Sequence, residues 1–132
     1  MLIRGCLRDY LITMKKMYIN GEWVDSPDTI EVLAPYTGEV IDTVPAATPE
    51  QLEAALAAAE KGAKVMAGLS AFERQQILMR TADLVSEHTE ELARLIATEV
   101  GKPVTEARGT VKRCVELLRL SGFEGAQLRG EY

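Results

Sequence analysis

The sequence has 132 residues, of which 47 % are hydrophobic and 27 % are charged, and its formal net charge is −5 at pH 7. This length allows one modest hydrophobic core, and the negative charge argues against nucleic-acid binding, which depends on a basic face. Two cysteines and one histidine exclude a disulfide framework and a zinc site, so no metal is predicted, and this usage is typical of a reducing, cytoplasmic compartment.

The first sixteen residues differ in composition from the rest of the chain. Four cationic side chains accompany one aspartate, and Arg8 and Asp9 interrupt the apolar run that a secretory signal needs. A membrane span needs about 20 apolar residues, so no membrane partner is predicted. We interpret residues 1–16 as a leader, either disordered or the product of a mis-assigned start, with Met14 or Met17 as the true first residue. The alternative is a short extra helix or a targeting arm.

Residues 17–46 are predicted to form short β-strands. An Asn-Gly pair in the β-prone run 18–24 is typical of a type I′ turn in a hairpin. Apolar residues then alternate over 30–34, and a turn with proline and glycine follows. The run 40–44 predicts a further strand, which Pro45 is expected to end.

Four helices are predicted after the strands. Thr48 and Gln51 have the spacing of a capping box around a proline at the first helical position, and Gly68 is a plausible end of this first helix. Ser70 and Glu73 form a second capping box, which begins a helix that runs towards His88. A third, short helix is predicted after the second.

The third helix is expected to begin with Thr89 as its cap and to end at Gly101 and Pro103. Lys102 would be a stabilising cation near the carboxyl end of this helix. The fourth helix begins near Pro103. Gly109 inside it costs about 1 kcal/mol relative to alanine, which suggests close packing or a local irregularity. The apolar residues of this helix predict one buried stripe: Ala107, Val111, Cys114, Val115, Leu118 and Gly122.

A few short strands cannot cover four amphipathic helices. We therefore expect a covering surface to be missing, and we expect the isolated chain to self-associate or to behave as a loose globule.

No residue of this chain is predicted to be catalytic. Cys114 follows Lys112 and Arg113, and nearby cations could lower the pKa of a thiol. Its place on the apolar stripe favours core packing instead. His88 is interpreted as a solvated or capping residue. The glycines near the carboxyl end follow a helix rather than a strand, so they do not predict a nucleotide-binding loop.

Several segments in order resemble the start of the aldehyde dehydrogenase superfamily. They are YINGEWVDS at 18–26 and the long run from EVLAPYTGEV to ATEVGKPVTEA at 31–107, with the N-G-x-W hairpin, the P-x-T-G-E turn, the x-x-E-R helix opening and E-x-G-K-P. Each motif is weak alone, but their order and spacing together are specific. The resemblance covers residues 17–132, roughly the first quarter of a family member.

The resemblance implies an α/β fold of the aldehyde dehydrogenase type, of which residues 17–132 would form an incomplete amino-terminal part of the cofactor-binding domain. Family members oxidise an aldehyde with NAD or NADP, using a cysteine nucleophile and a glutamate-activated water. These residues and the cofactor-binding glycines lie later in the family's sequence. The resemblance therefore assigns no catalytic residue and no cofactor-binding residue to this chain. No cofactor is expected to bind to this chain alone.

One substrate-binding residue is implied by the resemblance. GTVKRC at 109–114 is similar to the E-V-x-R segment of the subgroup with non-phosphorylating glyceraldehyde-3-phosphate and lactaldehyde dehydrogenases. The arginine of that segment reaches the anionic end of phosphate substrates, and it falls on Arg113 here; the alternative is a surface arginine. Thr110 departs from the usual glutamate. Val111 stands where some relatives have a cation-binding aspartate, so no ion is predicted there.

Two hypotheses of function result. In the first, the chain is a fragment, for example of a truncated reading frame, of an NAD(P)-dependent aldehyde dehydrogenase that acts on a small aldehyde as a homo-oligomer, dimer or tetramer. The fragment would be inactive alone. In the second, the chain is a non-catalytic assembly or interaction module derived from the family. A third, an active short enzyme that uses Cys114, is not expected.

Overall fold

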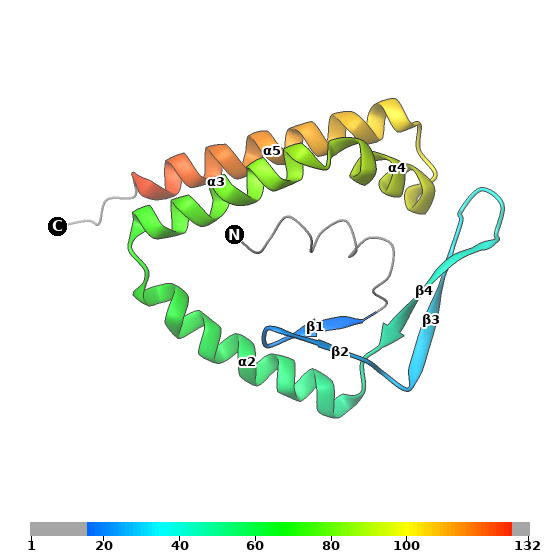
Figure 1. The fold of residues 1–132 in the computed structure, drawn as a ribbon, viewed down its shortest axis with the longest axis horizontal. Helices are drawn as coiled ribbons and strands as arrows, with labels where there is room; N and C mark the ends of the chain where they lie inside the picture. Colours follow the sequence, from blue (N-terminus) through cyan, green and yellow to red (C-terminus); the bar gives the residue numbers. More distant parts are fainter. Residues whose placement is uncertain (1–15, 128–132) are drawn as a thin grey trace. The chain divides into compact units, whose positions relative to one another are not determined.

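The computed structural model describes residues 16–127, so the leader predicted for residues 1–16 lies outside the described residues except for Lys16. Figure 1 labels the helices and strands. Among the described residues, 16–33 and 40–61 form one compact unit, and 34–39 and 62–127 form the other. The strands precede the helices, as the sequence predicts.

The first hairpin is confirmed. Strand β1 (Met17–Ile19) pairs antiparallel with β2 (Glu22–Val24), with Tyr18 opposite Trp23. The turn residues Asn20 and Gly21 have φ values of 53° and 85°, as a type I′ turn requires. The rings of Tyr18 and Trp23 lie 4.5 Å apart between centroids, so this cross-strand pair stabilises the hairpin.

The second hairpin corrects one predicted boundary. Strand β3 (Asp28–Leu33) pairs antiparallel with β4 (Val40–Ala46). Pro45 does not end β4, because the strand continues to Ala46 and places Pro45 opposite Thr29. In a two-stranded sheet both strands are edges, and an edge strand tolerates a proline where the missing N–H would face away from the partner.

Helix α2 (Pro49–Gly68) begins and ends where the sequence predicts. The backbone N–H of Thr48 donates to Gln51 Oε1 at 2.9 Å, and the N–H of Gln51 donates to Thr48 Oγ1 at 3.3 Å, so the capping box is confirmed. No residue of α2 is buried, and Leu52 and Leu56 are 54 % and 56 % exposed. The apolar residues of α2 thus lack a cover within the described residues.

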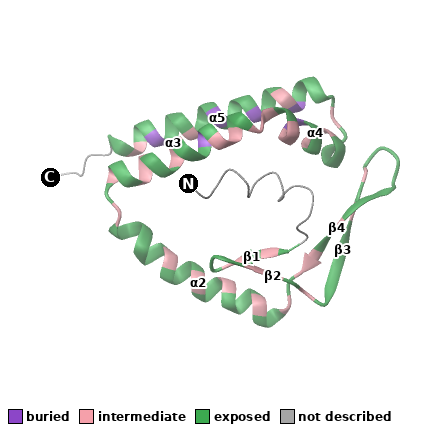
Figure 2. Cartoon of the chain, in the orientation of Figure 1, coloured by how far each residue is buried: buried purple, intermediate pink, exposed green. Residues whose placement is uncertain are grey.

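Helices α3 (Ala71–Glu87), α4 (Thr89–Val100) and α5 (Val104–Ala126) form the core of the second unit. Helix α5 packs along α3 and α4 (Figure 1). Figure 2 shows buried residues on these three helices, and the buried hydrophobic ones are Ala82, Ala93, Ala107, Val111 and Val115. Three of the five are alanines, whose single methyl group contributes little apolar area, so this core is small.

Two of the three glycines of α5, Gly109 and Gly122, differ in their surroundings. A Cβ added to Gly122 would lie 3.4 Å from Leu78 Cβ and 3.6 Å from the backbone oxygen of Gln75, so this glycine lets α3 and α5 approach closely. A Cβ added to Gly109 would meet nothing within 4 Å, and α5 is uninterrupted there. The expectation of close packing or an irregularity at Gly109 is therefore wrong.

The junctions between these helices confirm two predicted signals and correct a third. Ser70 and Glu73 form the predicted capping box, and Gly101 ends α4 in the left-handed conformation with φ 71°. Thr89 is not a cap: its hydroxyl donates to the backbone oxygen of Ser86 at 2.8 Å. Only His88 separates α3 from α4, so this hydroxyl lies beside the free carbonyls of the last turn of α3.

Candidate functional site

Arg113, the predicted substrate contact, lies on an exposed part of α5. The buried positions of this helix include Ala107, Val111 and Val115, and Arg113 lies on a different face. Among the described residues, no hydrogen bond or ion pair engages its guanidinium. The guanidinium is therefore available to a ligand or to another protein surface.

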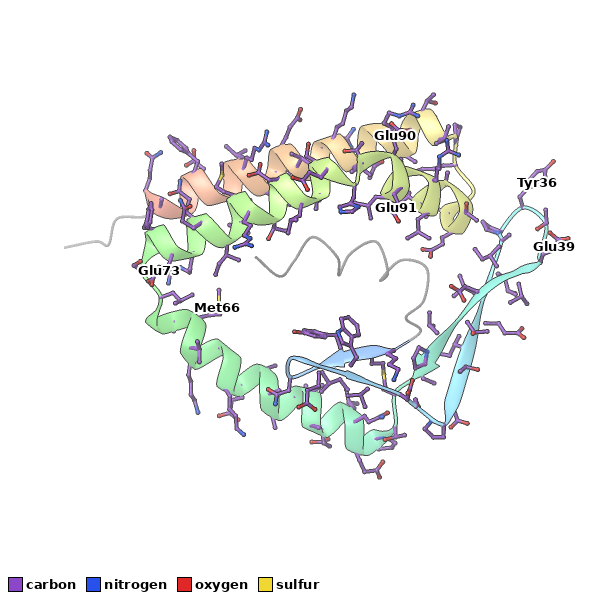
Figure 3. The ribbon with its side chains drawn as sticks, viewed as in Figure 1. Tyr36, Glu39, Met66, Glu73, Glu90 and Glu91 are labelled. Atoms are coloured by element: carbon purple, nitrogen blue, oxygen red, sulfur yellow. The ribbon has the colours of Figure 1, made fainter. Side chains whose placement is uncertain are left out.

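Arg108, on the same helix, is fully engaged by a carboxylate. Its Nε and Nη2 donate to the two carboxylate oxygens of Glu90 at 2.5 Å and 2.8 Å. This two-pronged bond lowers the pKa of Glu90 and raises that of Arg108. Figure 3 shows Glu90 and the neighbouring Glu91 on different sides of the first turn of α4. The pair joins α4 to α5.

Arg119 joins α5 to α3 in a similar way. Its Nη2 donates to Asp83 Oδ1 at 2.9 Å, and both side chains are about half exposed (49 % and 63 %). Together with the Glu90 pair, this contact holds α5 to both of its neighbours. It contributes to the position of the helix face that carries Arg113.

Thr110, three residues before Arg113 on α5, is bonded to Lys102. Lys102 Nζ donates to Thr110 Oγ1 at 2.8 Å, and Thr110 Oγ1 donates to the backbone oxygen of Glu106 at 3.1 Å. Lys102 directly follows Gly101 at the carboxyl end of α4, as the sequence predicts, and its side chain also bonds to α5. No local pattern of residues predicts this contact, because it depends on how the chain turns between the two helices.

The expected burial of Cys114 is wrong, because its thiol is exposed. The buried stripe of α5 steps from Val111 to Val115 and then to Gly122, and Cys114 lies at the edge of that stripe. Val111 is 3 % exposed and packs with Ala93 and Ala107 in the hydrophobic core. In residues 16–127, no group of three or more His, Cys, Asp or Glu side chains could hold a metal ion.

His88 has a structural place between α3 and α4. Its backbone N–H donates to the oxygen of Leu84 at 3.3 Å and so caps α3. Its Nδ1 lies 3.0 Å from Glu91 Oε2, and its side chain is 22 % exposed. The capping interpretation is thus confirmed for the backbone, while the side chain makes no cap bond.

The positive-φ glycines of the described residues do not have the arrangement of a dinucleotide-binding loop. The glycines with positive φ lie in hairpin turns (Gly21, Gly38) and between two helices (Gly101), not between a strand and a helix. Where β4 leads into α2, Thr48 already caps the helix amino end. None of the helices in the described part of the chain is long and apolar enough to cross a membrane.

Comparisons with known proteins agree with the resemblance seen in the sequence. The model of the aldehyde dehydrogenase family matches residues 23–132. The chain is 37 % identical to a 3-sulfolactaldehyde dehydrogenase of Priestia aryabhattai, over 87 % of this chain and 24 % of that protein. It is 34 % identical to an NADP-dependent glyceraldehyde-3-phosphate dehydrogenase of Streptococcus equinus, over 88 % of this chain and 24 % of that protein.

A solved structure shows the same arrangement of the backbone. The betaine aldehyde dehydrogenase of Staphylococcus aureus, in complex with NAD⁺, superimposes with a TM-score of 0.83 at 30 % identity, over 89 % of this chain and 24 % of that one. The chain spans about a quarter of the length of the relatives that it matches. This chain belongs to the aldehyde dehydrogenase family and corresponds to the amino-terminal segment of its members.

Proposed function

We propose that this chain works as the amino-terminal part of an NAD(P)-dependent aldehyde dehydrogenase that oxidises a small aldehyde to a carboxylate. The match to the family over residues 23–132 carries this proposal. The complete enzyme would be a cytoplasmic homo-oligomer, a dimer or a tetramer. NAD or NADP, when bound to the remainder of the enzyme, would accept the hydride.

We further propose that the 132-residue chain is inactive alone. The catalytic cysteine, the general-base glutamate and the cofactor-binding glycines of the family have no counterparts in it. Cys114 does not replace the nucleophile, since none of the described residues donates a hydrogen bond to its thiol or serves as its base. The role of the chain would be to place α5 and its exposed face beside the substrate.

The test compares the purified chain with the longer reading frame. We expect no formation of reduced nicotinamide by the chain with any aldehyde, with or without iodoacetamide. The coding DNA beyond Tyr132 should contain a frame, adjacent or shifted, with a G-Q-x-C-like segment. Aldehyde oxidation by the chain that iodoacetamide abolishes would overturn the proposal of inactivity.

Arg113 is the proposed contact of the anionic end of the substrate. Its guanidinium is exposed and has no partner among the described residues, which supports this proposal. The names of two relatives support it too, because their aldehydes carry a sulfonate or a phosphate. In the complete enzyme, Arg113→Gln should raise the KM for a phosphorylated aldehyde about 10- to 100-fold, as the loss of a charged hydrogen bond predicts. The KM for an uncharged aldehyde should stay unchanged. Lys112→Gln, on another face of α5, is the matched control.

A non-catalytic interaction module is the second candidate. The exposed apolar residues of α5, Leu117, Leu120 and Phe123, which are 55 %, 55 % and 57 % exposed, favour it. If the DNA beyond Tyr132 holds no catalytic segment, this candidate replaces the first.

A further inference from the structure

The turn of the first hairpin places the only asparagine of the chain directly before a glycine (Figure 1). The backbone nitrogen of the residue after an asparagine can attack the side-chain carbon Cγ and close a five-membered ring. Glycine favours this attack, because it has no side chain to shield its nitrogen. Asn20 and Gly21 are both exposed, and the atom nearest to a Cβ added at Gly21 would be Tyr18 Oη, at 3.8 Å. No neighbouring side chain of the described residues therefore shields the two reacting groups from solvent.

The conformation of the closed turn keeps the reacting atoms apart. The φ of Asn20 is +53°, as at the first central residue of a type I′ turn, where ψ is about +30°. At that ψ the nitrogen of Gly21 lies nearly opposite Cβ of Asn20 across the Cα–C bond, whereas ring closure requires both atoms on the same side. The backbone of the turn is therefore the restraint, since the Asn20 side chain makes no hydrogen bond to residues 16–127. Asn20 cannot cyclise while the hairpin is closed.

The β1–β2 hairpin is small enough to open. Each strand has three residues, and a two-stranded hairpin of this size is marginally stable by itself. The rings of Tyr18 and Trp23 lie 4.5 Å apart between centroids and join the strands on one face. At the open end Lys16 Nζ lies 2.8 Å from Asp25 Oδ2, but this ion pair is exposed and contributes little. Loss of the ring pair should therefore make the turn open more often.

We infer that Asn20 is a site of spontaneous deamidation and that opening of the β1–β2 hairpin controls the reaction. In the open turn the nitrogen of Gly21 loses its proton to solvent and forms a bond to Cγ of Asn20. The bond from Cγ to the carboxamide nitrogen breaks, and this nitrogen takes a proton from solvent and leaves as ammonia. Water then opens the succinimide ring. Its attack at the side-chain carbonyl gives aspartate, and its attack at the main-chain carbonyl gives isoaspartate, in which the backbone runs through Cβ.

The two products have different effects on the turn. Aspartate has nearly the shape of asparagine and tolerates positive φ, so the hairpin can form again. Isoaspartate adds one carbon atom to the backbone of the turn, and the register of the strands depends on a turn of exactly two residues. The pairing of Tyr18 with Trp23 is therefore lost in the isoaspartate form. An opening that ends in isoaspartate is permanent.

The test incubates the 132-residue chain at neutral pH and follows position 20 by peptide mass spectrometry, which separates asparagine, aspartate and isoaspartate. The modified fraction should grow in buffer, and it should grow faster in guanidinium chloride, where the hairpin is open. Trp23→Ala should accelerate the reaction in buffer about two- to fivefold, as the loss of a cross-strand aromatic pair predicts, and should leave the rate in denaturant unchanged. Tyr36→Ala, which removes an exposed ring from the turn between β3 and β4, is the matched control and should change neither rate.

Equal rates of the unchanged chain in buffer and in denaturant would overturn the control by the hairpin, and an unmodified position 20 in denaturant would overturn the site itself. If Trp23→Ala unfolds the hairpin completely, its rate in buffer should equal the rate in denaturant, as the inference also requires. The fluorescence of Trp23, the only tryptophan of the chain, tests the consequence for the turn. Emission of the purified isoaspartate form should shift to longer wavelength, because the half-buried ring becomes exposed, while that of the aspartate form should not. Identical spectra of the two forms would contradict the loss of strand pairing.

Discussion

Replacing Gly101 with alanine should loosen the end of α4 through two separable effects. The φ of Gly101 is +71°, a conformation that costs a residue with a Cβ about 1–2 kcal/mol. A Cβ there would also lie 2.9 Å from Pro35 Cγ, and such overpacking costs roughly 1–3 kcal/mol. Alanine gains back about 0.4–1 kcal/mol by restricting the unfolded chain. The net expected loss is therefore roughly 3 kcal/mol.

The contribution of the contact is isolated by removing its partner. In a Pro35→Ala background the Cγ is absent, and the Cβ of residue 35, now 3.7 Å away, is at ordinary contact distance. Gly101→Ala should then cost only about 1 kcal/mol, from the backbone alone. Gly101→Asn, which tolerates positive φ, should show the effect of the contact alone: a loss with Pro35 present and little loss without it.

Amide hydrogen exchange of the last turn of α4 is the assay, because it reports local opening even where the whole chain does not unfold cooperatively. The Gly101 N–H donates to Ala97 O at 3.0 Å, so its exchange follows this opening directly. A loss of 3 kcal/mol corresponds to about 150-fold faster exchange, and 1 kcal/mol to about fivefold. Equal acceleration by Gly101→Ala in both backgrounds would refute the contact between residue 101 and Pro35.

Three further predictions concern stability and association. The pKa of Glu90 is lowered, so its bond to Arg108 stabilises the fold above the ordinary pKa of 4.5, and this stabilisation is lost as pH falls through the pKa of the folded state. Glu90→Gln should therefore make the helicity of the chain less dependent on pH in the acid range. An unchanged pH profile of helicity would contradict the Glu90–Arg108 pair. Ser70→Ala removes the cap of α3 and should destabilise it by about 1 kcal/mol in urea unfolding, whereas an unaffected midpoint would show that the cap is dispensable. The isolated chain should self-associate or bind a hydrophobic dye in light-scattering and fluorescence measurements, and a monodisperse monomer with a sharp melt would show that its apolar faces are covered.

Local signals account for the features that the sequence predicts correctly. The Asn20-Gly21 turn and the caps at Thr48 and Ser70 depend on residues within four positions of one another, so their chemistry is visible in the sequence. Gly101 is readable for the same reason, because only its own backbone conformation is needed to end α4.

The errors concern residues whose surroundings are set by other segments. Threonine is a common helix cap, but α3 ends so close to Thr89 that the Thr89 hydroxyl donates to a backbone carbonyl of α3 instead. Cys114 fits the apolar pattern, yet burial is decided by where α3 and α4 meet α5. The bond from Lys102 to Thr110, eight residues away, is not predicted either, because it depends on the turn between the two helices. The spacing of apolar residues predicts which face of a helix is buried, but not how wide the buried part of that face is.

Helix α5 has apolar residues on two of its sides, and this bears on the proposed function. One side, with Ala107, Val111 and Val115, is buried against α3 and α4. The other carries Leu117 and Leu120, which remain more than half exposed. A helix that is apolar on opposite sides is typical of the interior of a larger protein, because a surface helix needs only one such stripe. The same helix displays Arg113 without a partner among residues 16–127, so a second layer of protein over α5 would enclose this guanidinium and make its contact with an anion more selective.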